Sequence, residues 1–110
     1  MSEAEDDGYL MANLPPRLTG LPMIIWVSER GSARHDVRIK VNPVHAPRVD
    51  YTNLATVAVR PVPRLVVGQL SAADLAAVSD WIGLNEAVIL DYWESRIYTD
   101  EMIARLQRLP

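Results

Sequence analysis

The longest periodic stretch of the chain reads SAADLAAVSDWIGLNEAVILDYW, residues 71–93. Its apolar residues recur every three or four positions, which is typical of a helix with one buried face. The Ser71 hydroxyl can accept a hydrogen bond from a backbone N–H of the first turn, and Asp74 favours the positive end of the helix dipole. We therefore predict a helix from about residue 72 to 94. Its apolar stripe is expected to comprise Leu75, Val78, Ile82, Ile89 and Trp93, widened by Trp81, Leu84, Val88 and Tyr92.

Apolar stretches rich in β-branched residues precede this helix. Residues 22–28 are apolar on both faces, residues 35–41 alternate between apolar and charged side chains, and residues 56–60 alternate again. A Gly-containing loop joins the first two stretches, which indicates a β-hairpin. Strands followed by helices, without βαβ alternation, predict an α+β fold. We expect an antiparallel sheet of about three strands, a long C-terminal helix packed on this sheet, and a short terminal helix at about 100–108.

The remaining segments give weaker signals. Pro61 and Pro63 lack backbone N–H donors, so the third strand should end there or lie at an edge of the sheet. Residues 64–68 follow as a short extended piece. Residues 1–21 are acidic and carry a Pro-Pro pair without sustained periodicity, and we interpret them as a flexible acidic lead-in. Residues 22–110 are then a single α+β domain.

The composition excludes several classes of protein. The 110 residues are 49% hydrophobic and contain no cysteine, so disulfides, thiolate catalysis and cysteine-based metal sites are ruled out. The first residues lack the basic and apolar regions of a signal peptide. No apolar run approaches the roughly 18 residues of a membrane span. We expect a cytoplasmic protein without a membrane partner.

The charges are distributed unevenly along the chain. Residues 17–64 carry eight Lys or Arg against three acids, whereas residues 1–16 carry four acids and no base. Arg34, Arg38 and Lys40 should share the outward side of the hairpin, where such a patch could hold phosphates. The patch has few aromatic residues for base stacking. The alternative is that these cations are solvated, or that they pair with the acidic helix or with the acidic N-terminal residues.

Two residues of the long helix have two interpretations. Trp81 belongs to the apolar stripe, so we expect it in the core; a buried Asn85 amide needs partners, which a backbone group would supply. In the sharper alternative, Trp81 and Asn85 line a pocket together with His35. Gly83 costs about 1 kcal/mol relative to Ala inside a helix, so we expect a neighbouring element to pass close to it.

The helix pattern W-I-x-L-N-x-x-x-I-L-D-Y-W, preceded by the strand R-H-D-V-R-I-K-V, resembles a set of short, stand-alone bacterial proteins of unknown function over about residues 14–110. It also distantly resembles a wider family of small bacterial domains, some encoded in toxin–antitoxin-like gene pairs. That family shows a His-x-His strand motif and a Trp…His…Leu…Trp helix. Here Val37 stands where the second His of the strand would be, and Asn85 stands where the helix often has His. The resemblance implies no settled activity.

Catalytic and metal-binding patterns are weak in this sequence. His35, Asp36, His45 and Asp50 are the local candidates for metal ligands, but they follow no recognised spacing. A Ser32–His35–Asp36 arrangement fails because neighbouring residues of a strand face opposite ways. The sequence contains no Gly-rich phosphate loop. We therefore predict no catalytic residues, no metal and no cofactor.

Two functional hypotheses remain from the sequence. The first is a non-enzymatic binding or regulatory module, with a protein partner or as a homodimer formed through the doubly apolar strand. The second is an RNA-binding or RNA-cleaving protein of the toxin type, in which His35 would act as acid or base beside Arg34 and Arg38. Nucleic acid is the less favoured partner. The candidate binding surface comprises Arg34, His35, Arg38, Lys40, Trp81 and Asn85.

Overall fold

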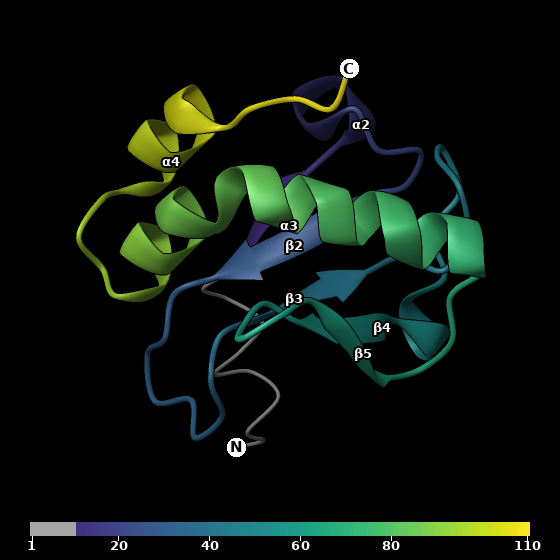
Figure 1. Ribbon diagram of the computed structural model, residues 1–110, viewed down its shortest axis with the longest axis horizontal. Coiled ribbons are helices and arrows are strands. Elements are labelled where there is room, and N and C mark those ends of the chain that lie inside the picture. The colour runs from purple at the N-terminus through teal and green to yellow at the C-terminus, as the bar shows by residue number, and fades with distance from the viewer. Residues whose placement is uncertain (1–10) are drawn as a thin grey trace.

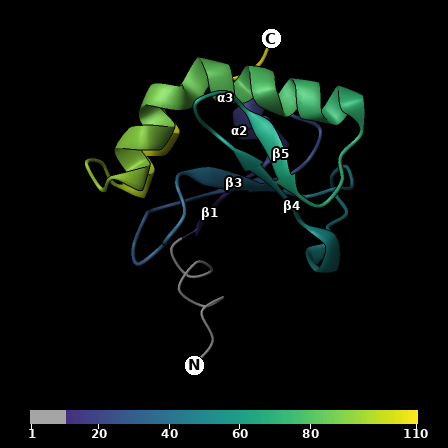
Figure 2. The same ribbon diagram turned by 60° about the horizontal axis from the view of Figure 1, so that its bottom comes forward.

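The computed structural model describes residues 11–110. Five strands form one antiparallel sheet in which each strand pairs with the next along the chain. The long helix α3 runs across one face of this sheet (Figures 1 and 2). The strands are β1 (Met11–Leu14), β2 (Ile25–Ser28), β3 (Arg38–Val41), β4 (Ala55–Ala58) and β5 (Arg64–Val67). The helices are α2 (Pro16–Thr19), the 3₁₀ helix η1 (Tyr51–Asn53), α3 (Ala72–Trp93) and α4 (Thr99–Arg105).

The predicted α+β class, the antiparallel sheet and the long helix are confirmed, but the predicted number of strands is too low. The strand β1 was missed, and β5 corresponds to the short extended piece expected at 64–68, which we did not count as a strand; each is four residues long. Strands this short show too few alternations to stand out from a loop. β1 falls inside the predicted lead-in of residues 1–21, of which residues 1–10 lie outside the described residues. Leu14 and Leu21 are buried in the core, so the packed part of the chain already includes residues that we assigned to the lead-in.

The core lies between α3 and the face of the sheet that α3 covers, here called the inner face. Val37, Ile39 and Val41 are buried on it, as the alternation in the sequence predicts. They meet Val78, Ile82 and Ile89 of α3 in one apolar cluster. Burial of one large apolar side chain contributes about 1.5–3 kcal/mol. The packing of α3 therefore depends mainly on its apolar stripe.

The helix α3 matches the predicted boundaries closely, and Ser71 Oγ accepts from the Asp74 backbone N–H at 3.0 Å as expected. Two details are wrong. Leu84 is 43% exposed, and a Cβ added to Gly83 would meet nothing within 4 Å. Both residues lie on the side of α3 that faces away from the sheet, so no element of residues 11–110 passes close to Gly83. No helix in the described part of the chain has the apolar length that a membrane crossing requires.

The short helix α4 ends at Arg105, earlier than predicted. The chain then continues in extended form, and the Leu109 N–H donates to the Thr19 carbonyl beside α2. Residues 106–110 are here called the C-terminal strap. The backbone is already extended at Leu106, and the Leu109–Thr19 hydrogen bond holds the strap against α2.

Candidate binding surface on the outer face of the sheet

The face of the sheet opposite α3, here called the outer face, carries a row of side chains that crosses all five strands. The register pairs each member of the row with the next, from β1 to β5. Because side chains alternate along a strand, these residues point away from the core. The row consists of Asn13, Trp26, Lys40, Thr56 and Val67.

A hollow of about 230 Å³ opens on this face, and we call it the outer hollow. Trp26 and Thr56 lie in it together with the cationic side chains of Arg38 and Lys40, and Met11 and His35 also line it. Trp26 is only 6% exposed, and its ring lies 6.1 Å from that of Tyr51, which is 71% exposed. None of the described residues that line the outer hollow carries a carboxylate. The hollow therefore combines two cations with an aromatic surface.

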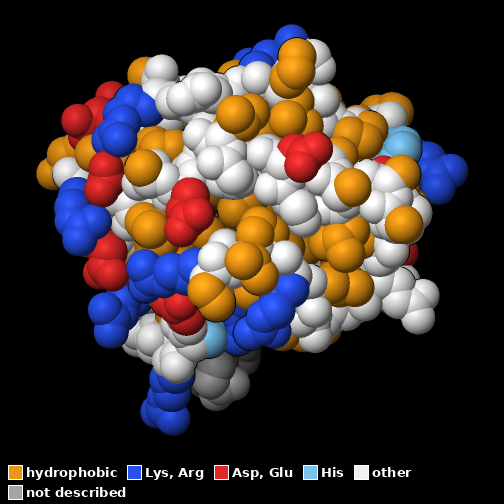
Figure 3. Space-filling model, viewed as in Figure 1, with side chains coloured by type: hydrophobic (Ala, Val, Ile, Leu, Met, Phe, Trp, Pro, Cys, Tyr) orange, Lys and Arg blue, Asp and Glu red, His pale blue; other side chains and the backbone are white. Residues whose placement is uncertain are grey.

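A second, smaller hollow of about 170 Å³ shares His35 and Arg38 with the first and adds Arg60 and Arg64. Its carboxylate, Asp36, is held by Arg60 through two hydrogen bonds of 2.9 Å. These bonds from Arg60, helped by the backbone N–H of Val37, lower the pKa of Asp36 to about 2 from an ordinary value of 3.8. The pair is neutral overall, so Arg38 and Arg64 set the charge of this second hollow. Figure 3 shows Lys and Arg side chains gathered along the lower left of the molecule.

His35 lies where these depressions meet. Its Nδ1–H donates to the Asp36 carbonyl at 2.8 Å. Its ring stacks on Trp93, with the centroids 5.9 Å apart and the planes at 28°. A third depression contains His35 together with the exposed Arg34. His35 is thus oriented by the end of α3 while its edge borders the basic surface.

The structure separates the six predicted surface residues into two groups. Arg38, Lys40 and His35 share the outer hollow, and Arg34 lies in the depression next to it. Trp81 and Asn85 are buried on the other side of the sheet and line none of the depressions that contain His35. The pocket of His35, Trp81 and Asn85 considered from the sequence is therefore not formed, because α3 turns both of its residues into the core.

Asn85 has a structural role that the sequence also suggested. Its amide Nδ2 donates to the carbonyls of Trp81 at 2.9 Å and Gln107 at 3.0 Å. Its Oδ1 accepts from the Gln107 backbone N–H at 2.7 Å. A buried amide with these three bonds is satisfied. Asn85 thereby fixes the C-terminal strap to α3.

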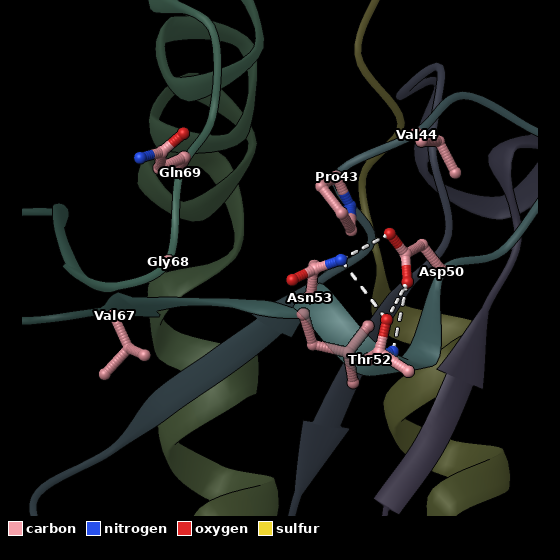
Figure 4. A pocket seen from close by; sticks show the side chains of 9 residues that line it. Pro43, Val44, Asp50, Thr52, Asn53, Val67, Gly68 and Gln69 are labelled. Atoms are coloured by element: carbon pink, nitrogen blue, oxygen red, sulfur yellow. Dashed lines mark hydrogen bonds between the residues drawn. The ribbon is translucent and has the colours of Figure 1, made fainter.

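A larger open depression of about 610 Å³ lies beside the outer hollow, with which it shares Leu54 and Val67. Figure 4 shows Asp50, Thr52 and Asn53 grouped on one side of this depression. The Asp50 carboxylate accepts from Asn53 Nδ2 at 2.8 Å and from the Thr52 hydroxyl at 2.6 Å, and these bonds lower its pKa. Because the carboxylate oxygens are already used to cap η1, they are poorly placed to bind a ligand.

Sequence reasoning missed part of this surface. Met11 belongs to the unpredicted strand β1, and Arg64 and Val67 belong to the extended piece that pairs as β5. The apolar pattern of residues 22–28 indicated a strand covered on both sides, or one whose outer face meets another chain. The pairing of Trp26 with Asn13 and Lys40 places it on the outer face. Within residues 11–110, no group of three or more His, Asp or Glu side chains lies close enough to hold a metal ion.

Comparison with models of protein families, with curated proteins and with solved structures gives no match for this chain.

Proposed function

We propose that this protein is a non-enzymatic binding module that holds an anionic partner on the outer face of its sheet. One observation carries the proposal. Arg38 and Lys40 lie side by side in a hollow that is lined by Trp26 and by no carboxylate among the described residues. Lone cations on a surface are normally solvated, but two cations that lie together in a hollow without a described carboxylate attract an anion more strongly than either cation does alone.

The partner need not be a second copy of the chain. A homodimer through β2 was suggested by the apolar side chains on both faces of this strand. Trp26, the large apolar residue on its outer side, is already 94% covered within one chain, since 6% of it is exposed. It therefore offers little additional area to a second copy. A cytoplasmic location and a bacterial origin remain part of the proposal and rest on the sequence alone.

The test compares two double variants that lose the same charge. R38Q/K40Q removes the cations of the outer hollow, whereas R17Q/R108Q removes two exposed cations from α2 and the C-terminal strap. We expect wild type to bind heparin at low salt, with an affinity that falls as salt rises. The slope of the logarithm of the binding constant against the logarithm of the salt concentration should fall by about one for each contact that R38Q/K40Q removes. R17Q/R108Q should leave this slope unchanged. An equal loss of heparin affinity in both variants contradicts the proposal. The proposal also fails if neither wild type nor a chain without its acidic N-terminus binds heparin.

One observation favours a second function, RNA binding with cleavage. His35 borders hollows that also contain Arg38 and Arg34, so an imidazole that can accept or donate a proton would lie beside phosphate-binding cations. The resemblance to small domains of toxin–antitoxin-like pairs stays a prediction and supplies no activity. Incubation with a labelled single-stranded RNA tests this function. Cleavage that His35→Ala abolishes and R17Q/R108Q preserves would establish it, and intact RNA would exclude it for that substrate.

A further inference from the structure

We propose that the outer hollow also binds a segment of its own chain, the acidic N-terminal segment that contains Glu3, Glu5, Asp6 and Asp7. The contact itself needs only the geometry of the hollow. The competition between this segment and an anionic partner for the outer hollow rests on the proposed function. The segment lies outside the described residues, and three observations on the described part of the chain point to this contact.

The first observation is where the described chain begins. Met11, the first residue of β1, itself lines the outer hollow. The acidic segment is therefore joined to the rim of the hollow, and not to a distant part of the molecule.

The second observation is reach. Met11 lies four positions after Asp7 in the sequence. An extended chain spans about 3.3–3.6 Å per residue, so four steps span about 14 Å. β3, which carries Arg38 and Lys40, lies two strands from β1 in the sheet. Two strand spacings amount to about 10 Å. Asp6 and Asp7 can thus reach both cations, and Glu3 and Glu5 have a longer tether.

The third observation is charge. The first ten residues hold four carboxylates and no Lys or Arg, and the lining of the outer hollow holds two cations and no described carboxylate. Asp36, which lines the adjoining smaller hollow, is engaged by Arg60, and the Asp50 carboxylate accepts hydrogen bonds from Thr52 and Asn53. Single exposed ion pairs contribute little. A short tether, however, gives the segment an effective concentration in the millimolar range, at which weak contacts are occupied for much of the time.

The experiment compares two charge-matched double variants in the full chain. D6N/D7N neutralises the acidic segment close to Met11. D80N/D100N neutralises two exposed carboxylates of α3 and α4 and changes the net charge equally. We expect D6N/D7N to bind heparin about two- to tenfold more tightly than wild type at low salt, as a competitor at millimolar effective concentration requires. The gain should disappear near 1 M salt, where the Debye length is about 3 Å. D80N/D100N should give little gain.

Two outcomes of this comparison overturn the inference. Equal gains in both variants would show a general effect of net charge, and no gain in D6N/D7N would show that the segment is not bound. Repeating D6N/D7N in the R38Q/K40Q background adds a third test. The gain must vanish there if the contact is in the outer hollow, and its persistence would place the segment elsewhere.

A direct measurement separates this inference from the proposed function. Wild type and D6N/D7N are compared by NMR, following the Trp26 indole and the backbone amides of β3, with no polyanion present. Shifts confined to these groups support the contact even if the protein binds no heparin, in which case only the proposed function fails. If the spectra of wild type and D6N/D7N are identical, the inference is wrong, and the proposed function is not affected. The synthetic peptide MSEAEDDGYL, added to a chain that lacks residues 2–8, should reproduce the shifts.

Discussion

The two faces of the sheet are built from the same strands but have opposite chemistry. On the inner face, Ile25, Ile39 and Val57 are fully buried beneath α3. On the outer face, the neighbouring positions carry Trp26, Lys40 and Thr56, with cations that line an open hollow. Stability and binding therefore depend on alternate residues of the same strands. Substitutions on the inner face should then change the free energy of unfolding, and substitutions on the outer face should mainly change binding.

The largest expected loss of stability comes from a substitution on the inner face. Trp81 is fully buried among the strands and α3. We expect Trp81→Ala to lower the free energy of unfolding by about 3–5 kcal/mol, because a large cavity replaces the indole. Arg38→Gln on the outer face should change it by less than about 0.5 kcal/mol. Urea denaturation measures both variants. Similar losses in the two variants would show that the faces are not divided in this way.

The next effect concerns a polar group on the buried side. Asn85→Ala removes three hydrogen bonds that hold the Gln107 and Trp81 backbone. We expect a loss of about 1–3 kcal/mol, since partners of a buried amide are left unpaired. Hydrogen exchange of the Gln107 and Leu109 amides should accelerate, because the C-terminal strap loosens. Asn13→Ala, at an exposed amide on the outer face, is the matched control. Unchanged exchange in Asn85→Ala would remove the role of Asn85 in holding the strap.

A third substitution tests the side of α3 that faces away from the sheet. Gly83→Ala adds a methyl group into open space inside a helix. It should raise the free energy of unfolding by up to about 1 kcal/mol, because Ala has the higher helix propensity. Gly20→Ala should do the opposite, since Gly20 has φ of +80° and its added Cβ would lie 2.7 Å from the Leu109 carbonyl oxygen. Thermal melting measures the stability of both variants relative to wild type. A Gly83→Ala variant that is less stable than wild type would mean that this side of α3 is covered.

The smallest effect is a dependence on pH at the edge of the outer face. Arg60 lowers the pKa of Asp36 to about 2 in the folded chain, below its ordinary value of 3.8. The folded state thus binds this proton less tightly, so the contribution of the pair is present above about pH 4 and lost as the pH falls through about 2. Asp36→Asn should melt slightly below wild type at pH 6, and the gap should close near pH 2. A gap that stays constant with pH would show that the ion pair contributes nothing.

Several features of the fold could be predicted because they are local. The apolar spacing and Ser71 define α3 within a residue of its observed ends. The alternation over residues 35–41 defines which side chains of β3 enter the core. The short strand β1 could not be predicted, because four residues carry no clear period. For β5 the sequence indicated a short extended piece at 64–68, but not its pairing with β4. The hydroxyl of Thr99, the first residue of α4, is hydrogen-bonded to the Tyr92 hydroxyl of α3 at 2.8 Å, a contact that depends on how the two helices pack.

For the candidate surface, the sequence alone predicts which side chains point to the outer face of the sheet and which point into the core. It placed Arg38 and Lys40 outward and Trp81 inward, because the periods of strand and helix fix those directions. The tertiary structure alone decided which of these residues meet. It brought Met11, Trp26 and Val67 from three strands to the cations of β3, and it set His35 against Trp93. Periodicity fixes the direction in which a side chain points, whereas the proximity of side chains on different strands depends on the order and register in which the whole sheet pairs.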